Sequence, residues 1–140
     1  MKRVITSVVF VISFVSLLVL GLVSRVQAGD CSNNSLKGTY GFSCEGTGGG
    51  LPIAVVAVFT ADGNGNGSEV ETISFNGDIS QGVPFTVTYT VNADCTGSIV
   101  TTAPDGAVTD HDFVIDDNKK EIRILVAEPG RVIVCVGRKQ

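Results

Sequence analysis

The sequence predicts an all-β protein, an eight-stranded antiparallel up-and-down barrel. From residue 37 on, apolar and β-branched runs of six to ten residues alternate with short clusters of Gly, Asn, Asp and Pro. All but one of the 17 glycines follow residue 28, and no stretch after that point keeps the 3.6-residue period of a helix. A two-sheet sandwich of the same strands is the alternative.

The first 28 residues have the pattern of a secretory signal peptide. Lys2 and Arg3 precede an almost uninterrupted apolar run over residues 8–23, and the stretch then ends in small Ala28, which suits signal peptidase. We therefore predict a signal peptide over 1–28, a single β-barrel domain over 29–140, and a secreted or periplasmic location without membrane attachment after cleavage. A retained membrane anchor is the alternative, because the run is about as long as a short spanning helix.

The apolar runs place the strands in order along the chain. The connections between them are short and turn-forming, so consecutive strands should pair as hairpins. An even number of strands lets the first and the last pair antiparallel and close the barrel, whose interior is then filled by side chains or holds one small ligand. We expect strands at 37–44, 51–60, 68–75, 83–91, 97–102, 111–116, 120–126 and 131–137.

The second run differs from the others because it is apolar on both faces, from Ile53 to Phe59. A barrel strand needs only one apolar face, and a row of exposed aliphatic side chains is uncommon on a soluble monomer. Its outer face should be covered by a partner subunit or by the N-terminal segment 29–36. The first option predicts a homo-oligomer formed through this strand.

Four cysteines in a short exported chain indicate two disulfides. They show no CxxC spacing and the chain has a single His, which argues against a zinc site. In a closed barrel Cys44, near the end of the first strand, lies beside the last strand with Cys135. This topology favours Cys44–Cys135 across the seam and Cys31–Cys95 at the N-terminal segment, whereas Cys31–Cys44 with Cys95–Cys135 is the rival pairing.

Four segments carry a resemblance to other proteins: CSNNSLKGTYGF, FTADGNGNGS, GVPFTVTYTVNADCTGS and GRVIVCVGRKQ. They resemble a group of small exported bacterial proteins with an LKGTYGF start, a Gly/Asn hairpin and a YTVNxDCTG strand end. The resemblance spans nearly all of the predicted mature chain and implies no assigned activity. In outline the chain is also similar to calycin-type barrels, since residues 37–40 stand where lipocalins place Gly-x-Trp, here without the Trp.

The Gly/Asn stretch 62–67 matches the first six positions of an EF-hand calcium loop. Position twelve would be Ile73 instead of a bidentate Glu, and the flanks are predicted strands. We therefore interpret the stretch as a hairpin loop and expect neither a metal nor a cofactor.

His111 is the side chain most suited to chemistry near neutral pH. Strand alternation places it on the inward face, whereas Asp110 and Asp112 point outward and cannot orient its ring. One interpretation is a core imidazole bonded to the hydroxyl of Tyr40 or Tyr89. The other is the polar contact of a small-molecule pocket. That pocket would be lined by Tyr40, Phe42, Phe85, Tyr89 and Phe113.

The chain shows no Gly-x-Ser-x-Gly, paired-carboxylate or HExxH arrangement, so we expect no enzyme. All 14 acidic residues follow the leader, whereas three of the ten basic residues lie within it, which argues against partners such as nucleic acid or anionic membranes. The first hypothesis is an exported, non-enzymatic envelope or extracellular interaction module. The alternative is a barrel that binds a small apolar or aromatic ligand. A filled interior would exclude the alternative, and a cavity of ~300 Å³ or more beside His111 would favour it.

Overall fold

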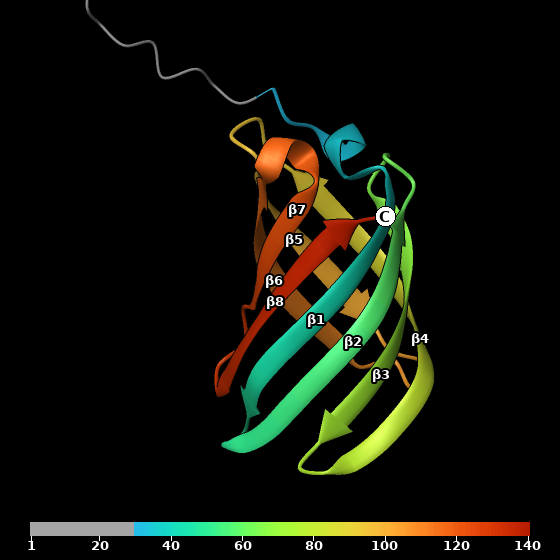
Figure 1. The fold of residues 1–140 in the computed structure, drawn as a ribbon, viewed down its shortest axis with the longest axis vertical. Coiled ribbons are helices and arrows are strands. Elements are labelled where there is room, and N and C mark those ends of the chain that lie inside the picture. Colours follow the sequence, from blue (N-terminus) through green and yellow to red (C-terminus); the bar gives the residue numbers. More distant parts are fainter. Residues whose placement is uncertain (1–29) are drawn as a thin grey trace, which may run out of the picture.

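The strands form one closed antiparallel barrel in which each strand pairs with its neighbours along the chain and β1 pairs with β8 (Figure 1). A computed structural model describes residues 30–140, so the predicted leader over 1–28 lies outside the described residues. The up-and-down barrel is confirmed and the sandwich is wrong. The strands are β1 (Gly38–Gly48), β2 (Leu51–Ala61), β3 (Asn66–Phe75), β4 (Asp78–Val91), β5 (Thr96–Thr102), β6 (Val108–Asp116), β7 (Glu121–Val126) and β8 (Arg131–Lys139).

The β3–β4 hairpin is longer than the sequence suggested. The stretch 76–82 was expected to be a connection, but only Asn76 and Gly77 turn, with φ values of 49° and 92°. Asn and Gly adopt positive φ at little cost, which is what a two-residue hairpin turn requires. The two strands pair on both sides of a β-bulge, with Glu71 opposite Val83 and Ile73 opposite Ser80. Strand β4 therefore has one extra residue at the bulge, which includes Gly82 (φ 65°). The hairpin projects past the other strands at the lower end (Figure 1).

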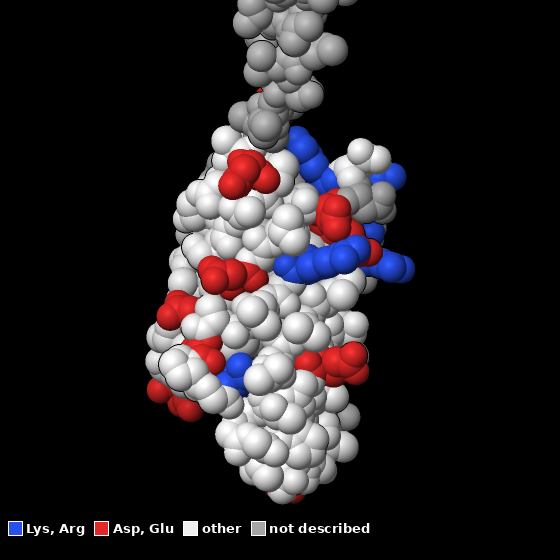
Figure 2. Space-filling view, turned by 90° about the vertical axis from the view of Figure 1, so that its left-hand side faces the viewer, with Lys and Arg blue, Asp and Glu red and all other residues white. Residues whose placement is uncertain are grey.

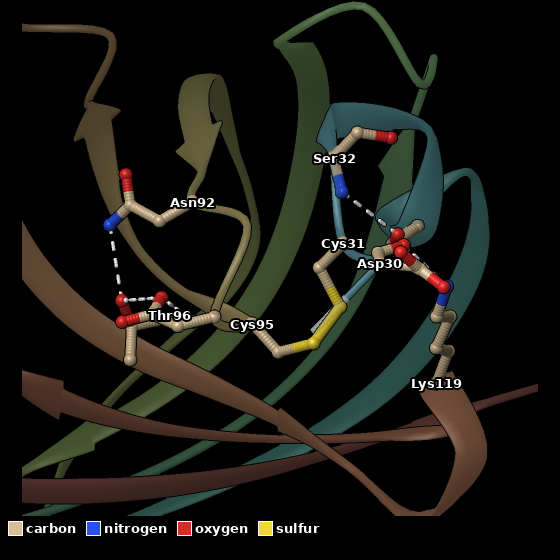
Figure 3. Close-up of a disulfide and its surroundings, with 9 residues drawn as sticks. Asp30, Cys31, Ser32, Asn92, Cys95, Thr96 and Lys119 are labelled. Carbon is tan, nitrogen blue, oxygen red and sulfur yellow. Dashed lines mark hydrogen bonds between the residues drawn. A yellow bond between two sulfur atoms is a disulfide. The ribbon is translucent and has the colours of Figure 1, made fainter. Parts of the chain in front are cut away.

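The N-terminal segment closes the upper end of the barrel. Its 3₁₀ helix η1 (Asn33–Leu36) places Leu36 in the core without exposed surface. The Asn33 side-chain oxygen accepts the N–H of Val91 at 2.8 Å, and the Cys31–Cys95 disulfide ties the segment to the β4–β5 turn (Figure 3). Residues 30–36 therefore do not cover the outer face of β2, and that alternative is wrong.

The upper half of the barrel is filled by aromatic rings. Tyr40, Phe42, Phe59 and Tyr89 form a chain of contacts with ring centroids 5.9–6.5 Å apart. Two of these contacts are edge-to-face, the arrangement that the ring quadrupoles favour. Burial of a large apolar side chain stabilises a fold by roughly 1.5–3 kcal/mol, so this layer contributes a large share of the core.

Inward-facing glycines make room for these rings. Gly137 of β8 pairs directly with Phe42, and Gly97 of β5 pairs directly with Phe113. A Cβ atom at either glycine would lie 2.4 Å from the partner ring. The absence of a side chain therefore lets each ring lie flat over the neighbouring strand.

The barrel seam carries the second disulfide. Cys44 of β1 and Cys135 of β8 are direct cross-strand partners, which is the pairing that the seam argument predicts. Two disulfides indicate an oxidising, non-cytoplasmic environment. Within residues 30–140, no helix combines the length and the apolar character needed to cross a membrane.

Candidate functional site

The lower half of the barrel contains a cavity of about 200 Å³. Its walls are mainly aliphatic, with the Cys44–Cys135 disulfide on one side and a few polar side chains among them. A smaller hollow of about 40 Å³ lies deeper and shares Glu71, Thr101 and His111 with it. The apolar walls are Ile53, Val55, Ile73, Phe85, Val126 and Ile133, and the polar side chains are Glu71, Thr101, Thr109, His111 and Arg131, with Glu69 in the smaller hollow.

Two carboxylates two residues apart on β3 face this interior. Register sets their direction, because Glu69 pairs with the inward Phe59 of β2 and Glu71 pairs with the inward Ala57. Val70 between them points outward and is half exposed. The expectation that the chain holds no paired carboxylates was therefore wrong. The sequence signal was ambiguous, because Val70 lies on one face of β3, whereas Ile73 and Phe75 share the face of the two glutamates.

Burial dominates the electrostatics of the two carboxylates. It raises the pKa of Glu69 to about 8, with a further contribution from the charge of Glu71, and it raises the pKa of Glu71 to about 7. Among residues 30–140, neither carboxylate takes part in an ion pair. Glu71 thus faces both the cavity and the smaller hollow, and Glu69 faces the smaller hollow, without a positively charged partner among these residues.

His111 points into the barrel as predicted, and the neighbouring Asp110 and Asp112 are exposed on the outside. Its Nδ1 lies 3.3 Å from the carbonyl oxygen of Ile99. The predicted bond to a core tyrosine hydroxyl is therefore wrong. Desolvation lowers the pKa of His111, although the Ile99 carbonyl and the nearby charge of Glu128 act in the opposite direction. The lowered pKa favours the neutral imidazole.

The two tyrosines lie in the upper half, away from the cavity. The Tyr89 hydroxyl accepts the N–H of Gly63 at 2.8 Å and thereby supports the β2–β3 loop. The Tyr40 hydroxyl is buried and has no hydrogen-bond partner within the described chain. The six predicted pocket residues therefore separate into two groups. His111, Phe42 and Phe85 line the hollow part, whereas Tyr40, Tyr89 and Phe113 belong to the packed part.

The loop that resembles half an EF-hand is closed on itself. The Asp62 carboxylate accepts the backbone N–H groups of Asn64 at 2.6 Å and Asn66 at 3.0 Å, and these bonds lower its pKa. These contacts are those of an Asx-type hairpin loop. In the part of the chain from residue 30 onward, no three His, Cys, Asp or Glu side chains gather as a metal site.

A second feature lies on the outside of the barrel. Val56 and Val58 of β2 are 59% and 48% exposed, and β8 carries a second group of exposed valines. Strand β1 separates the two groups, and its exposed Ser43 pairs with both Val56 and Val136. Figure 2, which views the barrel from the left of Figure 1, shows charged side chains separated by wide uncharged areas. We call this set the outer aliphatic face: Val56, Val58, Leu125, Val132, Val134 and Val136.

The chain matches no protein-family model, and comparison with curated proteins and with solved structures gives no significant similarity. The resemblance of its segments to small exported bacterial proteins, and of its outline to calycins, therefore stays a prediction.

Proposed function

We propose that this protein is an exported binding protein that holds a small ligand in the lower half of its barrel. The observation that carries the proposal is the cavity of about 200 Å³ with polar groups converging from β3, β5 and β6 on mainly aliphatic walls. Small-molecule sites usually combine an apolar lining with a few placed polar groups. Export rests on the leader predicted for residues 1–28 and agrees with the two disulfides.

The size of the cavity limits the ligand. At about 200 Å³ it does not reach the ~300 Å³ that we set as favouring a ligand site, which is the volume at which sites for drug-sized molecules begin. An apolar cavity of roughly 150 Å³ already holds benzene. The ligand should therefore be about as large as one aromatic ring with a single substituent.

The division of the barrel supports a binding role. The upper half is packed by aromatic rings and closed by the disulfide-tethered segment, whereas the lower half stays hollow. An interior that served stability alone would be filled throughout, because every void loses contacts between its lining atoms. A ligand can restore those contacts from the lower end.

The test is a titration of the isotope-labelled protein with small aromatic compounds followed by NMR. Shifts should cluster at cavity-lining residues such as His111 and Ile133. The half-buried Ala103 lines the cavity, so Ala103→Phe should fill it and reduce binding at least tenfold. Ala127→Phe, at an exposed position directly after β7, is the matched control. If no compound binds at millimolar concentration, or if Ala103→Phe binds as the parent does, the proposal is wrong.

A second candidate is an interaction module, which the outer aliphatic face supports. Its six side chains are each at least 39% exposed: four lie on the neighbouring strands β7 and β8, and two lie on β2 on the other side of β1. Exposed apolar side chains that gather on one side of a protein often mark a contact with another protein. A second copy of the chain, meeting it through β2, is the partner that we propose.

A further inference from the structure

We propose that the ligand of the cavity is a small organic cation, an alkyl- or arylammonium, whose nitrogen is held by the carboxylates of Glu69 and Glu71. This inference rests on the binding function proposed above and names the chemical class of its ligand. It is carried by the placement of two carboxylates, Glu71 on both the cavity and the smaller hollow and Glu69 on the smaller hollow, with no cation paired to either among residues 30–140.

The strands around the two carboxylates offer no compensating charge. On β2 the direct partners are Phe59 and Ala57, and on β4 they are Phe85 for Glu69 and Val83 for Glu71. All four are apolar. The side chains therefore project from β3 into a space whose nearest walls cannot neutralise them.

Arg131, the one cation among residues 30–140 that lines the cavity, is engaged elsewhere. Arg131 binds the Glu128 carboxylate at 3.1 Å, and its guanidinium also lies 3.4 Å from the Thr109 hydroxyl. Both contacts are at the start of β8, beside the β7–β8 turn. The charge of Arg131 is thus matched by Glu128 and is not available to Glu69 and Glu71.

The other polar groups on the cavity do not neutralise the charge of the two glutamates. Thr101 from β5 carries no charge, and the lowered pKa of His111 from β6 favours its neutral form. When the glutamates ionise, the interior carries unmatched negative charge, and burying such charge without a partner is costly. A ligand cation would supply the missing partner and gain charge-assisted hydrogen bonds from its N–H groups.

The walls favour an organic cation over a metal ion. Hard metal ions need several oxygen ligands, and no set of three metal-ligating side chains converges among residues 30–140. The aliphatic lining, including Ile73 and Ile133, instead suits a hydrocarbon body beside the charged group. In an ammonium attached to one small ring or short chain, the charged nitrogen would contact the carboxylates and the hydrocarbon would pack against the aliphatic walls.

The experiment compares three probes of nearly equal shape: benzylammonium, benzyl alcohol and benzoate. Calorimetric titration at about pH 8, where Glu71 is largely ionised and Glu69 about half ionised, should give benzylammonium at least tenfold tighter binding than benzyl alcohol and no binding of benzoate. Binding of the ammonium should also release protons, because the bound cation stabilises the ionised carboxylates.

Matched variants assign the effect to the two carboxylates. Glu69→Gln combined with Glu71→Gln should abolish the preference for the ammonium and leave benzyl alcohol binding within about twofold. Glu45→Gln, on the exposed outer side of β1, should leave the preference intact. Dispersed NMR spectra and unchanged benzyl alcohol binding would show that the variants remain folded.

The outcomes separate this inference from the function on which it rests. If benzyl alcohol or benzoate binds in the cavity as tightly as benzylammonium, the cation inference is wrong and the binding function stands. If none of the three probes binds, both are wrong. If calcium or zinc chloride alone binds and the double glutamine variant loses it, the site is a metal site and the organic cation is wrong.

Discussion

Cys44 and Cys135 face each other across the β1–β8 seam with their Cα atoms 4.0 Å apart, and both border the interior cavity. This bond joins the first strand to the last and spans 91 positions of the chain. It therefore acts where a barrel would otherwise open, and it forms part of the wall that a ligand would meet.

Removal of the seam disulfide should destabilise the barrel strongly. In the chain-entropy model a closed loop of this length is worth about 4 kcal/mol. We expect the Cys44→Ala, Cys135→Ala variant to lose about that much free energy of unfolding in urea. The Cys31→Ala, Cys95→Ala variant is the comparison, because it should expose the N-terminal segment to protease while the seam stays closed. A seam variant that loses less than about 1 kcal/mol would contradict the role assigned to this bond.

Substitution of Gly137 should disturb the aromatic layer. A Cβ atom there would lie 2.4 Å from ring carbons of Phe42, so the ring or the strand must move. Overpacking of this kind costs on the order of 1–3 kcal/mol. We expect Gly137→Ala to lower the free energy of unfolding by that amount in urea denaturation. Gly48→Ala is the control, because its nearest contact, the Phe75 ring, is at 3.5 Å; equal stability of the two variants would refute the packing argument.

Stability should fall as the pH rises from about 5 to about 8. The folded-state pKa values of Glu69 and Glu71 are raised to about 8 and about 7, so the folded chain holds protons that the unfolded chain has released. Their contribution is complete below the unfolded value near 4.5 and is lost as the pH passes through the folded values. The loss is at most about 1.4 kcal/mol per pH unit for each group.

Urea unfolding of the free protein across this range measures the effect. The Glu69→Gln, Glu71→Gln variant should show a flatter profile and exceed the parent in stability at about pH 9. The lowered pKa of His111 acts in the opposite direction, because its contribution is present above its unfolded value and is lost as the pH falls. A parent profile that rises between about pH 6 and about pH 8 would show that the glutamates do not dominate.

The outer aliphatic face should mediate self-association. Val56 lies on it with 59% of its surface exposed, and a charge there would have to be desolvated in a contact with a second copy. We expect Val56→Lys to convert a dimer to a monomer in light scattering. Thr86→Lys, on the exposed side of β4, should leave the dimer intact. A parent chain that stays monomeric at every concentration would disprove this contact.

The sequence by itself was sufficient to predict the barrel, because eight apolar runs joined by short turns leave few other ways to pair strands without exposed edges. It also predicted the two cysteine pairs, since closure brings the first strand beside the last. The inward direction of His111 followed from simple alternation with Phe113 and Ile115.

Only the tertiary structure decided what the interior contains. Glu69 and Glu71 point inward because β3 takes its register from Ala57 and Phe59 of β2, and a shift by one residue would have turned Val70 inward instead. Apolar side chains occur on both faces of β3, with Val70 on one and Ile73 and Phe75 on the other, so local sequence could not decide which face turns inward. The division into a packed upper half and a hollow lower half likewise depends on which rings lie over Gly97 and Gly137. Those rings belong to neighbouring strands, so only the closed barrel brings them together.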